Sequence, residues 1–327
     1  MELGDDLKED LMNFAIEPNQ NEYFAEGNYQ VSDEAYELLH GAIDTHVHAN
    51  PTMGDGFVLD DFELVQECQE AGLDGVVIKC HEFGTMLRSK IAQKYAAKGD
   101  FKVYGSVTLN EHVGGLNPVA VESAINCGAK TVFLPTFTAA NQIQIWTGTV
   151  CYPHYAPEIT GMNLKTASPK GIYILDDEGN LKPEMYTILE LVRDADVVIS
   201  SGHISNIEAL TLFREAKKMG VRKMVHQHID WRTSEMSIGM QREMASLGVK
   251  MEKSFYEFDA DRSLKSFMAT AGTKPSDYVM SSDQGMFPAL RALRGYACNV
   301  QEHLNGGVPA ADLKVMLQDV PHFLMEG

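Results

Sequence analysis

Two histidines at alternate positions are the first feature of this sequence that could do chemistry. They stand at the end of the apolar run Ile43-Asp44-Thr45-His46-Val47-His48. Because residues i and i+2 of a β-strand point to the same side, the imidazoles of His46 and His48 would converge on one face. Neutral imidazoles in such a position are typical ligands of Zn, Fe or Mn. Taken alone, the His-x-His pattern is also compatible with packed core histidines.

Polar residues of metal-binding type also follow three other apolar runs. They occur in Ser200-Ser201-Gly202-His203, in His226-Gln227-His228 and in Ser281-Ser282-Asp283. If the runs are parallel strands, these residues meet the two histidines at one edge of the sheet. Asp283 has a second interpretation, as a turn residue within Ser-Ser-Asp-Gln-Gly. Four histidines and one carboxylate at a single edge nevertheless form a much more specific pattern than His-x-His.

The spacing of the apolar runs predicts a (β/α)8 barrel of the TIM type. Eight short runs, which lack the alternation of half-exposed strands, end near His48, His81, Asn110, Pro135, His203, His228, Phe255 and Asp283. Between them lie helical patterns, and six glycines stand between a helical pattern and the next run, namely Gly72, Gly99, Gly128, Gly220, Gly248 and Gly272. Glycine there indicates a left-handed residue that ends a helix. We therefore expect one distorted barrel over residues 41–327, preceded by an N-terminal extension, residues 1–40.

One connection between the runs is much longer than the others. It separates Pro135 from His203 by 68 residues (135 to 203), whereas the longest other interval is 33 residues (48 to 81). The surplus, residues 139–182, follows the fourth strand and so lies on the C-terminal rim, where barrels carry their active sites. We expect it to form a lid. A doubly wound open sheet is the alternative fold, but no GxGxxG or GxxxxGK[ST] phosphate loop is present.

Composition restricts the partners and the compartment. The 327 residues carry 27 basic and 46 acidic side chains, a net charge of −19, which disfavours nucleic acid as a ligand. No apolar run reaches the ~18 residues of a membrane span, and the acidic N-terminus lacks a signal-peptide pattern. The five cysteines show no CxxC spacing, which fits a reducing compartment. The sequence thus predicts a cytoplasmic protein with a small-molecule substrate and leaves a homo-oligomer open.

With these strands in order, the sequence resembles the metal-dependent amidohydrolase superfamily. The resemblance runs from Gly41 to about Leu304 and rests on the five strand-end residues. The segments Lys79-Cys80-His81, 109–118 and Ser201-Gly202-His203 resemble an uncharacterised, amidohydrolase-like branch. The resemblance implies a divalent metal, zinc with manganese or iron as alternatives, bound by His46, His48, His203 and Asp283. It makes His228 either a ligand of a second metal or a catalytic acid/base.

The end of the fourth strand departs from the superfamily pattern. Binuclear members carry a carboxylated lysine or a glutamate there, whereas this chain has Leu134-Pro135-Thr136. One metal ion is therefore expected rather than two. Lys79 on the second strand could provide an unusual carbamate bridge. The preferred interpretation of Lys79 is a buried cation that pairs with a neighbouring carboxylate or binds an anionic group of the substrate.

The chemistry implied by this resemblance is hydrolysis of an amide-like or ester-like bond in a small polar molecule by metal-activated water. Asp283 would accept the proton of the water, and His228 would stabilise the oxyanion or donate a proton. Substrate contacts are expected from Lys79, His81, His112 and Arg232, although turns and surface salt bridges are alternatives for the last two.

Two other functions remain open. The first is a metal-dependent nonoxidative decarboxylase of a small carboxylic acid, because superfamily members without the strand-four ligand include such lyases. The second is a binding barrel without catalysis, against which the five intact site residues argue.

Overall fold

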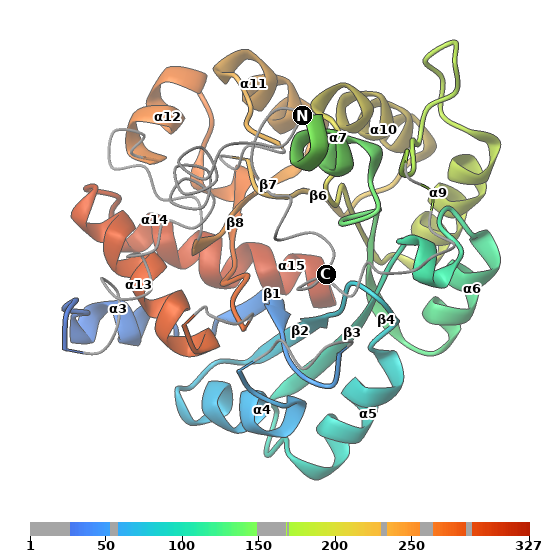
Figure 1. Ribbon diagram of the computed structural model, residues 1–327. Helices are drawn as coiled ribbons and strands as arrows, with labels where there is room; N and C mark the ends of the chain where they lie inside the picture. Colours follow the sequence, from blue (N-terminus) through green and yellow to red (C-terminus); the bar gives the residue numbers. More distant parts are fainter. Residues whose placement is uncertain are drawn as a thin grey trace, which may run out of the picture.

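The computed structural model of the chain forms a ring of eight parallel strands with helices around it (Figure 1). It describes residues 27–52, 58–148, 168, 170–229, 234–255, 264–285 and 290–327. The strands follow the order of the sequence, from β1 (Ile43–His48) through β2 (Gly75–Lys79), β3 (Lys102–Thr108), β4 (Ala129–Phe133), β5 (Val198–Ser200), β6 (Met224–His226) and β7 (Lys250–Lys253) to β8 (Tyr278–Met280). Each strand pairs in parallel with the next.

Helices connect these strands and cover the outside of the ring. In chain order they are α3 (Asp33–Leu38), α4 (Asp61–Glu70), α5 (Met86–Tyr95), η1 (Glu111–Val113), α6 (Pro118–Asn126), α7 (Ala140–Gly148), α9 (Pro183–Ala195), α10 (Asn206–Met219), α11 (Ile238–Leu247), α12 (Leu264–Ala271), η3 (Pro275–Asp277), α13 (Ala292–Asn305), α14 (Ala310–Lys314), η4 (Val315–Asp319) and α15 (Val320–Glu326). The predicted helix ends are confirmed, because all six glycines adopt a positive φ.

The ring is nearly closed by main-chain hydrogen bonds between the segment after β8 and β1. The amide of Asp283 donates to the carbonyl of His46 at 2.8 Å, and the amide of His48 donates to the carbonyl of Gln284 at 2.9 Å. These bonds bring the last predicted strand end against the first. The prediction of a (β/α)8 barrel is therefore confirmed.

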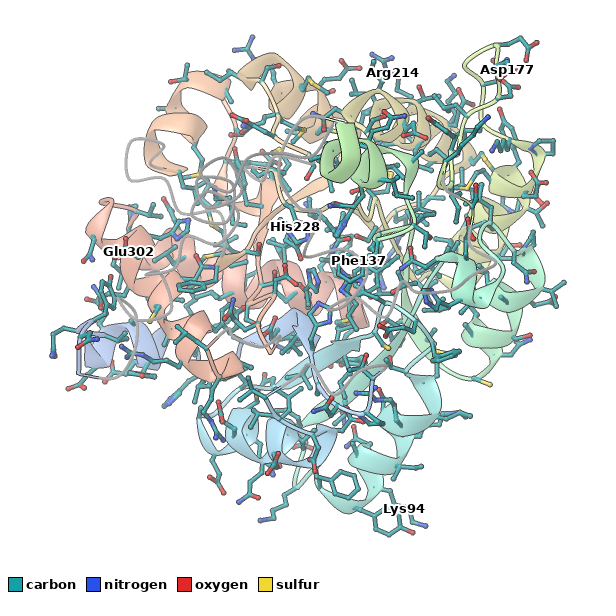
Figure 2. The ribbon with its side chains drawn as sticks, viewed as in Figure 1. Lys94, Phe137, Asp177, Arg214, His228 and Glu302 are labelled. Carbon is teal, nitrogen blue, oxygen red and sulfur yellow. The ribbon has the colours of Figure 1, made fainter. Side chains whose placement is uncertain are left out.

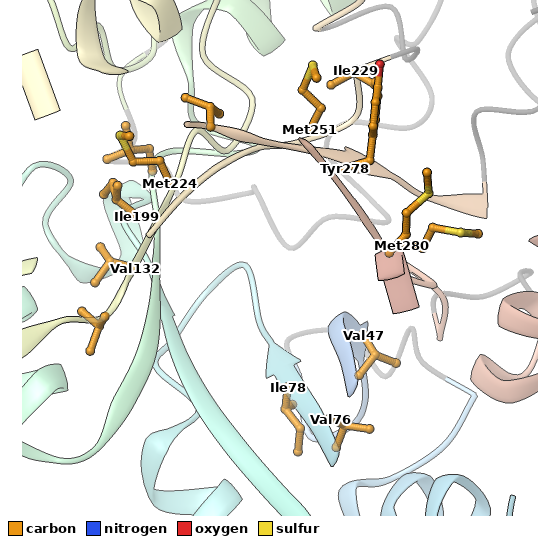
Figure 3. Packing of buried hydrophobic residues seen from close by; sticks show 14 of the residues in the cluster. Val47, Val76, Ile78, Val132, Ile199, Met224, Ile229, Met251, Tyr278 and Met280 are labelled. Carbon is orange, nitrogen blue, oxygen red and sulfur yellow. The ribbon is translucent and has the colours of Figure 1, made fainter. Parts of the chain in front are cut away.

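The hydrophobic core has two layers. The larger lies between the strands and the outer helices, and Figure 3 follows it around the ring through Val76, Ile199, Met251 and others. The smaller lies inside the barrel, where Ile43, Val77, Val198, Val225 and Val279 meet the apolar side chains of α15. The side chains of α15 fill one end of the barrel interior, and the polar strand ends gather at the opposite, C-terminal mouth.

A bulge in β1 decides which side chains reach that mouth. Asp44 pairs with Val76, but Val47 pairs with Ile78. Three residue steps along β1 therefore correspond to two along β2. The extra residue changes the parity of the strand. Ile43 thus packs inside the barrel, while Val47 joins the outer layer with Ile78. His46 and His48 consequently face the interior, as the i, i+2 rule predicted for the pair.

The long connection after β4 is described only in part. It begins with α7, and Leu175 pairs antiparallel with Leu181 in the segment expected to form a hairpin. Residues 149–167 and 169 lie outside the described residues, so the lid stays a prediction. Of the extension, residues 1–40, the described part includes α3, which packs against α13 and buries Ala35 completely, and Leu39 directly after this helix is also completely buried. Among the helices described, none is long and apolar enough to cross a membrane.

Candidate metal centre and active site

His46 is the hub of the polar cluster at the barrel mouth. Its side chain is completely buried, and both ring nitrogens have partners. On one side, Nδ1 lies 3.0 Å from Oε1 of Glu252 and 3.1 Å from Nε2 of Gln227. On the other side, Nε2 lies 2.8 Å from Oδ1 of Asp283 and 2.8 Å from Nζ of Lys79. The imidazole therefore stands between two carboxylates, one on β7 and one in the segment that follows the neighbouring strand β8.

Asp283 joins three of the predicted histidines. Its Oδ1 atom, 2.8 Å from His46, also lies 3.1 Å from Nε2 of His48. Its Oδ2 atom lies 3.6 Å from Nε2 of His228. Asp283 is 6% exposed and has a left-handed backbone with φ of 47°. Because the strand has already ended at Met280, this turn directs the side chain back over the mouth.

Glu252 on β7 is a site residue that sequence reasoning missed. Its Oε1 atom accepts from Ser281 at 3.0 Å in addition to its contact with His46, and Oε2 lies 3.7 Å from Nδ1 of His228. Only 2% of the residue is exposed. The available signal was the acidic residue in the middle of the short strand Lys250–Lys253, where a barrel strand would ordinarily place an apolar side chain.

His81 forms a second layer behind His48. Its ring stacks on that of His48 at a centroid distance of 4.8 Å and on that of Phe137 at 3.8 Å. Its Nδ1 atom lies 2.8 Å from Oγ1 of Thr136, which also accepts from the side-chain Nδ2 of Asn110 at 2.7 Å. Thr136 belongs to the segment Leu134-Pro135-Thr136, which stands at the end of strand four, where binuclear members of the resembled superfamily carry a metal ligand. Its hydroxyl group is engaged by His81 and Asn110 instead.

His203 and His228 close the cluster from β5 and β6, near the centre of the ring, where Figure 2 shows His228 and Phe137. Their ring centroids are 5.3 Å apart, and the His228 centroid is 5.4 Å from that of His46. His203 follows Gly202, whose φ is 58° and whose added Cβ would lie 2.3 Å from the carbonyl oxygen of Leu134. Glycine is needed there because the β5 loop passes against the chain after β4.

Burial and mutual charge set the protonation of the cluster. Burial alone would lower the pKa of His46, but the carboxylates of Asp283 and Glu252 raise it to about 9. Burial also acts against ionisation of Glu252, yet the imidazoles of His46 and His228 lower its pKa to about 2. The pKa of Asp283 is likewise held well below its usual value by His46 and His228, against the effect of burial. Burial lowers the pKa of His48 to about 4. The cluster thus combines two carboxylates with neutral and charged imidazoles.

Lys79 contributes a buried cation to the same cluster. It is 1% exposed, and its Nζ atom lies 2.8 Å from Nε2 of His46 and 5.0 Å from the ring centre of Phe133. Within the described part of the chain, no carboxylate oxygen lies within 4 Å of this atom. Burial lowers the pKa of Lys79 to about 8. Of the two roles expected for Lys79, pairing with a neighbouring carboxylate is thus not realised among these residues.

Among the described residues, two groups of donor atoms fit a metal ion. One consists of His46, His48 and Asp283, and the other of His46, His228 and Glu252; within each group the donor atoms lie within 4.8 Å of one another. Donors that share one ion at about 2.1 Å stand roughly 3 to 4 Å apart, so both groups are near that spacing. Imidazole nitrogen and carboxylate oxygen are also the donor types that Zn, Mn and Fe accept. His203 belongs to neither group.

The other two expected substrate-binding residues are not found in the histidine cluster among the described residues. His112 lies on η1, and its ring contacts Phe83 at a centroid distance of 6.5 Å rather than any strand-end histidine. Arg232 lies outside the described residues. His81 and Lys79 are therefore the two of the four candidates that the structure places beside the histidine cluster.

Comparisons with known proteins identify a family and a fold. A family of unknown function (DUF6282) matches residues 41–252, which includes β1 and most of β7 but not Asp283. No curated protein matches the sequence. Among solved structures, an amidohydrolase from Pseudomonas aeruginosa is similar with a TM-score of 0.56 at 12% identity, covering 90% of this chain and 99% of the other. The probable dipeptidase PvdM from Pseudomonas aeruginosa is similar with a TM-score of 0.54 at 13% identity, and the match covers 90% of this chain and 96% of the dipeptidase. An organophosphorus hydrolase from Deinococcus radiodurans is similar with a TM-score of 0.50 at 12% identity, and the match covers 89% of this chain and 93% of the hydrolase. The resemblance to amidohydrolases is thus confirmed at the level of the fold.

Proposed function

The chain belongs to the DUF6282 family, and we propose that it is a metal-dependent hydrolase acting on an amide-like or ester-like bond of a small polar molecule. The observation that carries the proposal is the convergence of two imidazoles and one carboxylate on one point of the barrel mouth. Nε2 of His46 and Nε2 of His48 lie 2.8 Å and 3.1 Å from the same oxygen of Asp283. Barrels of this class place their active sites at that end.

His46, His48 and Asp283 would hold the ion, with His203 and His228 on the open side. A divalent ion in that place lowers the pKa of water towards neutrality and polarises a carbonyl group. Zinc is the expected ion, with manganese or iron as alternatives, and the donor set supports one ion more readily than two. His46 is shared by both donor groups, and its two nitrogens point to opposite sides.

The proton-transfer roles follow from the charges around Asp283 and His228. The pKa of Asp283 is held well below its usual value, so its carboxylate is ionised at neutral pH, which is the state that a proton acceptor requires. His228 lies 3.6 Å from this carboxylate, so that a closer approach or one bridging water would let the imidazole receive the proton and pass it to a leaving group. The two residues would form a relay across the mouth of the barrel.

Glu252 would act as a positioning residue for this site. A histidine that binds a metal commonly donates its other N–H to a carboxylate, which fixes the tautomer and the orientation of the ring. The 3.0 Å contact between Glu252 and Nδ1 of His46 has this arrangement. With the proton fixed on Nδ1, the lone pair of Nε2 faces His48 and Asp283, where the ion is expected.

Lys79 supports a second candidate, nonoxidative decarboxylation of a small carboxylic acid. A buried ammonium with no carboxylate within 4 Å among the described residues suits a negatively charged substrate group. The strand-four position, where Thr136 is engaged with His81, also fits superfamily members that carry out such lyase reactions. A substrate carboxylate held by Lys79 would lie beside His46.

Product analysis of the metal-loaded protein distinguishes these reactions. The protein is assayed against small amides, lactones and carboxylic acids, with ¹⁸O-labelled water and with detection of released CO₂. Incorporation of ¹⁸O into a product carboxylate supports the hydrolase, and CO₂ release supports the lyase. A metal-free protein whose binding of small ligands does not depend on added metal would contradict both and would favour the binding barrel.

A further inference from the structure

An apolar stripe lies along the outer face of α5. Leu87, Ile91 and Tyr95 are four residues apart and are 65%, 52% and 68% exposed. On a helix this spacing places them on one side. The helix turns only its small side chains, Ser89 and Ala92, completely inward. The outward face of α5 is therefore the apolar one, which is the reverse of a solvent-exposed barrel helix.

The same helix is basic in a strongly acidic protein. Residues 86–98 carry Arg88, Lys90, Lys94 and Lys98 and no acidic residue, whereas the whole chain has a net charge of −19. Arg88 is used within the chain by a 2.6 Å ion pair with Asp61. The three lysines are exposed, and the ammonium of Lys94, which Figure 2 shows at the edge of the molecule, lies 4.8 Å from the ring centre of Tyr95.

The neighbouring helix α4 has the opposite charge. It carries Asp61, Glu63, Glu67 and Glu70 and no basic residue, and Phe62 on its outer side is 44% exposed. An open hollow of about 560 Å³ lies along it, lined by Glu63, Gln66, Glu67, Glu70, Ala71, Arg291 and Leu293. Figure 1 shows α4 and α5 side by side at one corner of the barrel. The corner thus presents an acidic helix and a basic, apolar helix to the same partner.

We propose that this corner is the interface of a two-fold homodimer in which α4 of each copy packs against α5 of the other. A two-fold interface is self-complementary, since each patch meets its counterpart on the second copy. A two-fold axis parallel to the helices places acidic α4 opposite basic α5 twice. An axis across the helices would instead place like charges together. An anionic membrane surface is disfavoured as the partner because the acids of α4 would face it.

The contacts between α4 and α5 within one chain give the register of the dimer. Asp61 pairs with Arg88, and Nε2 of Gln69 donates to the carbonyl of Ala96 at 3.1 Å, so residues 27 positions apart lie at the same height. A rotation about an axis parallel to the helices preserves height. Glu63 therefore faces Lys90 of the second copy, and Glu70 faces the end of α5 near Lys98, whereas Glu67 is held within its own chain by a 2.7 Å ion pair with Arg291. The apolar stripe on α5 lies between these charges.

The interface is small and charged, so the dimer is expected to depend on concentration and salt. Two ten-residue helices are each about 15 Å long, and the patch they form is smaller than that of most permanent dimers. Raising the salt from about 0.1 M to about 1 M shortens the Debye length from about 10 Å to about 3 Å and weakens the exposed pairs. Sedimentation of the full chain over a range of micromolar concentrations measures both dependences.

Substitutions at matched positions test the surface. Ile91→Asp should raise the dimer dissociation constant at least about tenfold, because it places a charge within the apolar stripe. Ile207→Asp, at a residue of α10 that is 73% exposed, is the control and should leave the constant unchanged. Glu70→Lys and Lys98→Glu should each weaken the dimer, and the double variant should restore it. Thermal unfolding checks that all variants are folded.

Three outcomes would overturn the proposal. The first is a wild-type chain that stays monomeric at every concentration at low salt. The second is a dimer that Ile91→Asp and Ile207→Asp affect equally, which would place the interface on another face. The third is a charge-exchanged double variant that is no tighter than either single variant, which would exclude the opposed pairing of α4 and α5.

Discussion

Removal of the charge of Glu252 provides the sharpest test of the proposed metal centre. In Glu252→Gln the side chain keeps its shape in a position that is 2% exposed, so the packing of β7 is preserved. The carboxylate that accepts from His46 Nδ1 and Ser281 Oγ, each at 3.0 Å, is replaced by a neutral amide. If the amide oxygen faces His46, the bond is weaker. If the amide nitrogen faces it, the proton moves to Nε2 and blocks the metal-binding lone pair.

The magnitude follows from the kind of hydrogen bond that is lost. A bond to a charged group contributes roughly 1.5–3 kcal/mol and a neutral bond roughly 0.5–1.5 kcal/mol, a difference of about 1–1.5 kcal/mol. Since about 1.4 kcal/mol corresponds to a factor of ten, the metal dissociation constant should rise about tenfold. Losses of about 10- to 100-fold are usual when such an outer carboxylate of a metal site is removed.

The assay is a competition titration of Zn or Co with a chromophoric chelator, combined with the visible spectrum of the Co-loaded protein. Glu208→Gln is the matched control, because Glu208 is also a buried carboxylate, 5% exposed, that accepts from the amide of Ile174 at 3.0 Å. The control should lower the unfolding temperature and leave metal affinity unchanged. A metal affinity of Glu252→Gln within about twofold of wild type would refute the reasoning, because a tenfold effect follows from the charge that it removes.

Three further predictions concern the same end of the barrel. The double variant His46→Ala/His48→Ala should lose the roughly one equivalent of metal per chain expected after purification without chelator, as measured by mass spectrometry, and unchanged metal content would remove both residues from the site. Asp283→Asn should lower turnover about 10²- to 10⁴-fold while metal content falls much less, and near-full turnover with metal bound would show that Asp283 is not the base. Gly202→Ala should lower the free energy of unfolding, measured by urea titration, by at least about 2 kcal/mol, because its Cβ would lie 2.3 Å from a main-chain oxygen. In the control Gly99→Ala the new Cβ meets no atom within 4 Å, so the variant should lose only about 1 kcal/mol through backbone strain.

The barrel could be predicted from the sequence because its signals are local and repeated. Apolar runs report strands buried on both faces, and a glycine that ends a helix is needed whatever the tertiary contacts are. The predicted strand ends lie at most three residues beyond those of the structure, for example at His203 where β5 ends at Ser200. The discrepancy has one physical cause: the polar residues follow the last paired residue, where the chain has already turned.

The site could be predicted only in part, because whether a residue belongs to the site depends on the direction in which its side chain points within the barrel. His46, His48 and Asp283 converge as expected, and His228 lies beside them. Glu252 was missed because a single acidic residue on a strand carries no motif, and its role arises only when the ring closes and brings β7, two strands away, near β1. The bulge in β1, which directs both histidines inward, likewise leaves no mark in the apolar pattern.

The backbone at the two proposed proton-transfer residues supports their assignment independently of their side chains. Among the described residues, three other than glycine have a positive φ, namely Asp196, His228 and Asp283, with values of 50°, 52° and 47°. Asp196 ends α9, an ordinary place for a left-handed residue. His228 and Asp283 end no helix. A left-handed conformation at such places costs energy, and it is retained only where the surrounding structure holds the backbone in place.

The surroundings that hold this backbone are those that build the site. The amide of Asp283 donates to the carbonyl of His46, while the hydroxyl of Ser234 donates to the carbonyl of His228 at 2.7 Å. Each turn therefore depends on a bond made by a neighbouring segment of the mouth. This bears on the choice of variant, because asparagine tolerates the left-handed conformation about as readily as aspartate does. Asp283→Asn thus changes the charge and proton affinity of the side chain without adding backbone strain. Asp283→Ala would change both, and its loss of turnover could not be assigned to the proton-transfer step alone.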